Sequence, residues 1–99
     1  MNTLISEFVN YLKTEKKASA NTLSSYTRDI KQFFDYISTN SLDMIKITKT
    51  NIITYMLYMQ KSGRAASSVS RSLASVRAFY NYLMIKDFVA TNPAYDLEA

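Results

Sequence analysis

Apolar residues between positions 23 and 37 recur at the period of an α-helix, and this pattern constrains the fold most strongly. The positions are Leu23, Tyr26, Ile30, Phe33, Phe34 and Ile37. At about 100° per residue, they fall within roughly a third of the helix circumference. The stretch therefore predicts an amphipathic helix with one face buried.

Three other segments have a similar apolar stripe. In residues 3–16 it comprises Leu4, Ile5, Phe8, Val9 and Leu12. In residues 48–63 it comprises Ile52, Ile53, Met56 and Leu57. In residues 66–86 the buried side is expected to hold Val69, Leu73, Val76, Tyr80, Leu83 and Met84, with Phe79 on its edge. Tyr26 and Tyr80 are expected in the core, whereas Tyr36, Tyr58 and Tyr82 are expected nearer the edges.

Local signals place the ends of these helices. Ser19 and Thr48 suit N-cap positions, and Gly63 suits the left-handed position after a helix. The second helix should end near residues 39–40, and Asn92-Pro93 prevents continuation of the fourth. A single Gly and a single Pro among 99 residues also disfavour an all-β fold with many tight turns. We therefore expect an all-α, compact four-helix bundle over residues 1–92, with 93–99 as a tail or the start of a linker.

Composition excludes several kinds of catalytic chemistry. The chain has no Cys and no His, which removes disulfides, thiolate or imidazole metal sites and histidine acid–base catalysis. With Gly63 as the only glycine, no glycine-rich phosphate loop exists. Asp29 and Asp35 would lie about 120° apart on one helix, too far around it for a carboxylate dyad. We expect no catalytic residue, cofactor, metal or small-molecule substrate.

The net charge of +4 is compatible with a nucleic acid or an anionic membrane as partner. The basic residues are spread over several helices rather than along one face, which disfavours membrane binding. Polar residues interrupt the N-terminal stretch where a signal peptide needs an apolar run, and no run reaches transmembrane length. We expect a cytoplasmic protein, with which the absence of Cys agrees.

The polar side of segment 66–86 favours nucleic acid. Ser67, Arg71, Ser75 and Ala78 follow helical spacing, and no acid occurs between Gly63 and Lys86. Small side chains allow close approach, hydroxyls can donate to phosphate oxygens, and Arg can fork onto phosphate or guanine. The second helix has a similar strip of Thr22, Ser25, Arg28 and Lys31, with Asp29 and Asp35 expected off its centre. An ordinary solvated surface is the alternative for any one Ser.

Three stretches of the sequence together resemble the core-binding domain of tyrosine recombinases, which include phage integrases and Xer-type enzymes. Residues 19–23 followed by Tyr26, Asp29, Ile30 and Phe33 resemble its second helix. Ser67-Ser68-Val69, Arg71, Leu73, Val76-Arg77, Phe79-Tyr80 and Tyr82-Leu83 resemble its fourth helix, and Asn92-Pro93-Ala94 resembles the exit toward the catalytic domain.

The resemblance implies a SAM-like bundle that contacts double-stranded DNA through its second and fourth helices. The expected DNA-contacting residues are Asn21, Thr22, Ser24, Ser25, Arg28, Lys31, Arg64, Ser67, Ser68, Arg71 and Ser75. Arg28 and Arg71 are the expected main contacts, and Arg77 is expected to be a structural or flanking cation. Strand cleavage would belong to a separate catalytic domain, and other recombinase protomers would be partners of the full-length protein. The alternative is a helical module for protein assembly with little DNA affinity.

Overall fold

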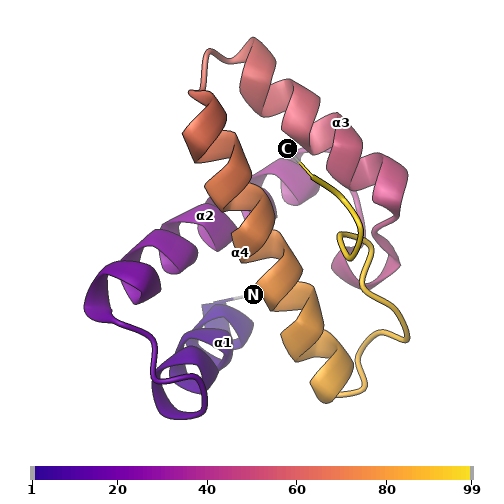
Figure 1. Cartoon of the computed structure of the whole chain (residues 1–99). Helices are drawn as coiled ribbons and strands as arrows, with labels where there is room; N and C mark the ends of the chain where they lie inside the picture. Colours follow the sequence, from indigo (N-terminus) through magenta and orange to yellow (C-terminus); the bar gives the residue numbers. More distant parts are fainter. Residues whose placement is uncertain (1, 99) are drawn as a thin grey trace.

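The computed structural model describes residues 2–98, which form four α-helices and one short 3-10 helix (Figure 1). In chain order these are α1 (Asn2–Thr14), α2 (Ala20–Thr39), η1 (Met44–Lys46), α3 (Lys49–Lys61) and α4 (Ala66–Ile85). Residues 2–98 contain no strand, and the predicted all-α architecture is confirmed. Within this part of the chain, no helix combines the length and apolar character that crossing a membrane requires.

The predicted helix ends are confirmed by local hydrogen bonds. The Ser19 Oγ accepts a 3.2 Å hydrogen bond from the Thr22 amide at the start of α2. Thr48 begins α3 in a capping box, in which its side chain and that of Asn51 accept each other's backbone N–H. Gly63 follows α3 with a φ of +86°, a conformation that side-chain-bearing residues rarely adopt.

Helices α2 and α4 cross at the centre of the molecule, with α1 against α2 and α3 against α4 (Figure 1). Aromatic rings fill the interior between them. Phe79 on α4 meets Phe8 of α1 and Phe34 of α2 edge to face, with ring centroids 5.4 and 5.3 Å apart. Phe33 makes similar contacts with Tyr55 and Tyr80. These bulky rings on all four helices form one continuous core.

Several burial predictions were wrong in detail. Phe79 and Tyr82, expected at edges, are 0% and 2% exposed, because α1 covers that side of α4. In α3, Ile53 and Leu57 are exposed and Tyr55 and Met59 are buried in their place. The face that α3 turns to the core is therefore Ile52, Tyr55, Met56 and Met59. Tyr26, expected in the core, is only half-buried, and Met84 at the end of α4 is 37% exposed.

The segment after Pro93 packs against the bundle. Ala94 and Leu97 are buried, and the Arg77 guanidinium donates hydrogen bonds to both of their carbonyl oxygens. The Asn92 side chain in turn donates a hydrogen bond to the Arg77 carbonyl, so side chains of both segments bond the backbone of the other. Arg77 thus has a structural role, and packing does not stop at the predicted domain boundary of residue 92.

Candidate nucleic-acid interface

One face of α2 presents the cations that the sequence analysis selected. Arg28 and Lys31 are exposed, as are Asn21 and Ser24, while Thr22 and Ser25 are half-buried. The Ser24, Arg28 and Lys31 side chains line one shallow hollow along the helix. Thr22 is already engaged, because its hydroxyl accepts a 3.0 Å hydrogen bond from Ser19 at the helix cap.

The two acids of α2 do not share one environment, and the expectation that both lie off the strip's centre was wrong for Asp35. Asp35 is exposed and lines the same hollow as Arg28 and Lys31. It follows Arg28 by seven residues, or about two helical turns, so both project from the same face. Asp29 is 0% exposed and therefore is not part of the surface.

The strip predicted on α4 is only partly exposed. Ser67 is exposed, and Ser68 and Arg71 are half-buried, near the N-terminal end of the helix. Ser75 is 0% exposed, so its expected place on the outer face was wrong. The spacing of four residues drifts about 40° per step around a helix, and by Ser75 the strip has turned into the contact with α2.

Asp29 joins these two helices through a buried hydrogen-bond network. The Arg71 Nε and Nη2 donate to the two carboxylate oxygens of Asp29, each at 3.0 Å. The Ser75 Oγ donates to Asp29 Oδ2 at 2.8 Å. The hydrogen bond with Asp29 raises the pKa of Arg71, so the guanidinium is held in its charged form.

Arg64, in the turn between α3 and α4, also has a partner within the chain. Its Nη1 donates a 2.9 Å hydrogen bond to the Gln32 side chain of α2. Arg64 and Arg71 therefore both reach α2 from sites more than a helical turn apart along the chain. These contacts hold the N-terminal part of α4 against α2.

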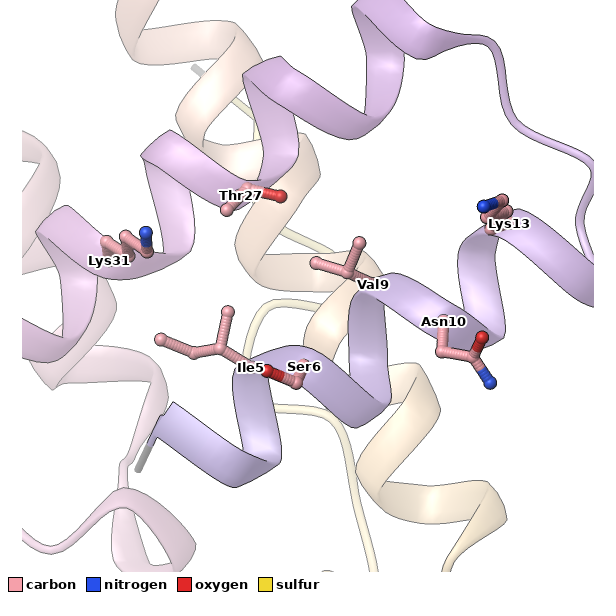
Figure 2. A pocket seen from close by; sticks show the side chains of 7 residues that line it. All are labelled: Ile5, Ser6, Val9, Asn10, Lys13, Thr27 and Lys31. Atoms are coloured by element: carbon pink, nitrogen blue, oxygen red, sulfur yellow. The ribbon is translucent and has the colours of Figure 1, made fainter.

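A second hollow lies between α1 and α2, and the sequence analysis did not anticipate it. Figure 2 shows Ile5 and Val9 pointing from α1 toward α2, with Lys13 and Lys31 at opposite ends of the view. The α1 side also contributes Ser6 and Asn10, and α2 contributes Thr27. The polar residues at 6, 10 and 13 follow helical spacing, which is the signal that could have identified this side of α1.

The family model described as "Phage integrase, N-terminal SAM-like domain" matches residues 5–87. The chain belongs to this family. All four helices of the SAM-like domain overlap the matched residues, and the resemblance seen in the sequence is confirmed. The buried part of the segment after Pro93 lies beyond the match.

The SAM-like domain is also similar along nearly its whole length to Xer proteins. It is 39% identical over 98 residues to the tyrosine recombinase XerC of Leptospira interrogans, covering 98% of this chain and 32% of the relative. It is 35% identical over 100 residues to the tyrosine recombinase XerD of Listeria innocua, covering 99% of this chain and 34% of the relative. The chain thus spans about a third of the length of the curated relatives it matches.

Proposed function

We propose that this SAM-like domain binds double-stranded DNA as the N-terminal module of a tyrosine recombinase. The observation that carries the proposal is the exposed face of α2 with Arg28 and Lys31, on the helix whose Asp29 is hydrogen-bonded to Arg71 of α4. Matching relatives bear the name tyrosine recombinase, which supports DNA as the partner. The parent protein would act in DNA integration or recombination, with catalysis supplied by a separate domain and with other recombinase protomers as partners.

The two helices differ in what they offer to DNA. On α2, Arg28 and Lys31 supply charge for phosphate oxygens, with Asp35 opposing them on the same face. On α4, Ser67 and Ser68 are small, which allows the helix to approach a groove edge, and their hydroxyls are suited to phosphate. Because few cations face the duplex, we expect weak, salt-sensitive binding whose salt dependence reflects only a few phosphate contacts.

Binding can be tested by fluorescence anisotropy with a labelled duplex over a range of salt concentrations. Arg28→Gln with Lys31→Gln should weaken binding and reduce the slope of log K against log salt by about two, one for each lost phosphate contact. The control, Lys86→Gln with Lys49→Gln, lowers the net charge equally at sites outside the proposed surface. Equal weakening by both pairs, or no salt-dependent binding at all, would contradict the proposal.

NMR titration of the labelled domain with the same duplex locates the surface. Shifts should concentrate in residues 21–31 and 64–71 and fade as salt is added. Shifts confined to α1 or α3 would rule out the proposed face.

The second candidate is an assembly module, and the outer face of α3 favours it. Ile53, Leu57 and Tyr58 are 40%, 50% and 54% exposed on neighbouring turns. Exposed apolar residues that gather on one face are typical of protein contacts. Concentration-dependent self-association in sedimentation, without any DNA binding at low salt, would favour this function over the first.

A further inference from the structure

We propose that Asp29 is a positioning residue that fixes the Arg71 guanidinium so that its free edge meets a pair of acceptors on DNA. This inference rests on the proposed function, since it assigns the orientation of one contact on the same surface. It accounts for an otherwise unfavourable arrangement, a carboxylate placed beneath a surface that is to receive phosphates.

The geometry of the network leaves one side of Arg71 available. Asp29 occupies the Nε–H and one Nη2–H of the guanidinium at 3.0 Å each. A guanidinium carries five N–H donors in one plane, so three remain, on Nη1 and on the second Nη2 position. Those three point away from the carboxylate. The Arg71 side chain is 36% exposed while that of Asp29 is 0% exposed, so the free edge is the side toward solvent.

Asp29 is itself held in place. Its Oδ2 accepts a 2.8 Å hydrogen bond from Ser75, one helical turn beyond Arg71 on α4. The fixed carboxylate limits the rotation of a long side chain that otherwise loses rotamer freedom when it binds DNA. A preoriented fork of two parallel donors matches two phosphate oxygens or the O6 and N7 of guanine.

The pairing of Asp29 with Arg71 also changes what Arg71 is expected to contribute to the attraction of DNA. Asp29 and Arg71 together carry no net charge, so Arg71 adds no long-range attraction and acts through directed hydrogen bonds at contact. A simple charge argument predicts that removal of any acid from this surface strengthens DNA binding. If Asp29 positions Arg71, removal of the Asp29 carboxylate should instead weaken DNA binding, unlike removal of the other acids.

The decisive variant is the charge-matched double substitution Asp29→Asn with Arg71→Gln. It preserves the net charge and removes the fork, and it should weaken duplex binding by about five-fold or more. The control is Lys49→Gln with Asp96→Asn, which neutralises an exposed ion pair elsewhere and should leave binding unchanged. Unchanged binding by the first double variant would overturn the inference.

Two single substitutions separate positioning from charge. Asp35→Asn removes an exposed acid near Arg28 and should strengthen binding, whereas Asp29→Asn should weaken it. Equal strengthening by both would overturn the inference. Arg71→Lys retains the charge and a partner for Asp29 but has no planar fork, and it should also bind more weakly. Circular dichroism and NMR spectra recorded at the titration temperature establish that each variant is folded.

The source of the paired acceptors follows from the same titrations. A phosphate contact makes the double variant bind more weakly to the same degree whatever the duplex sequence. A guanine contact instead gives the wild-type domain a preference among duplexes of different sequence, and the double variant should lose that preference. If the wild-type domain shows no salt-dependent binding, the proposed function itself fails. If the wild type binds and the double variant binds equally, only the role of Asp29 and Arg71 fails.

Discussion

The Tyr80 hydroxyl lies 2.7 Å from the carbonyl oxygen of Met44 and donates a hydrogen bond to it. This contact joins α4 to the first residue of η1, the short helix between α2 and α3. The Tyr80 ring is 1% exposed and meets Phe33 edge to face, so the hydroxyl reaches the carbonyl from within the core. This hydrogen bond thereby ties the connector to α4 and the core.

Tyr80→Phe should lower the free energy of unfolding by about 1–2 kcal/mol, because the Met44 carbonyl loses its donor. Urea denaturation measures this change. Tyr95→Phe removes the same hydroxyl from a ring that is 78% exposed and should leave the midpoint unaltered. Equal stability of Tyr80→Phe and the wild type would show that the connector does not depend on this hydrogen bond.

Alkaline pH should destabilise the fold through Tyr55. Burial raises the pKa of Tyr55 to about 12, and nearby Arg64 opposes the shift only in part. The folded protein therefore holds this proton more tightly than the unfolded chain, whose tyrosine pKa is about 10. The contribution is complete below pH 10, and the free energy of unfolding should fall above it by roughly 1.4 kcal/mol per pH unit until about pH 12.

Tyr55→Phe removes that loss, so its stability relative to the wild type should rise between pH 10 and pH 12. Thermal or urea unfolding at several pH values measures the difference. Tyr58→Phe, with a ring that is 54% exposed, serves as the matched control. Parallel pH profiles for the wild type and Tyr55→Phe would contradict the assignment.

Ser72 offers a site for stabilisation. Its hydroxyl oxygen is buried on α4 and has no hydrogen-bond partner within residues 2–98. Ser72→Ala should raise the free energy of unfolding by about 1 kcal/mol, since it removes an unsatisfied polar group. Ser70→Ala makes the same change on the exposed side of the helix and corrects for helix propensity. A gain no larger than that of Ser70→Ala would mean that the hydroxyl is satisfied in solution.

Arg77→Met should release the segment after Pro93. The variant loses the donors to the Ala94 and Leu97 carbonyls, and we expect a loss of about 1.5–3 kcal/mol because the donor is charged. Hydrogen exchange should accelerate first at residues 94–97. Lys49→Met breaks only the exposed contact with Asp96 and should leave exchange there unchanged. Unaltered protection in Arg77→Met would show that apolar burial alone holds the segment.

Local signals in the sequence were sufficient for the helices and their ends. Ser19, Thr48 and Gly63 act on backbone groups within a few residues, so their effects can be predicted without the tertiary structure. Local signals of this kind could not predict that α3 buries Tyr55 rather than Ile53. The choice of buried face on α3 depends on how α4 and α2 approach it, which apolar spacing alone leaves open.

At the candidate site, too, local features could be predicted from the sequence, whereas contacts between distant segments could not. Exposed Arg28 and Lys31 follow from the periodicity of α2, and Asp35 could have been placed beside them by its distance of seven residues. The pairing of Asp29 with Arg71 spans 42 residues of sequence and depends on the crossing of α2 and α4. Ser75 was misassigned for the same reason, since its neighbour across the helix contact was unknown.

The burial of Ala94 and Leu97 has a consequence for biosynthesis. A nascent chain that has emerged only as far as the end of α4 leaves Arg77 without its two carbonyl acceptors and part of the interior open to water. We expect such a chain to form its helices early and to acquire its final rigidity only after residue 97 has left the ribosome. The short segment after Pro93 would then complete the folding of this domain during translation.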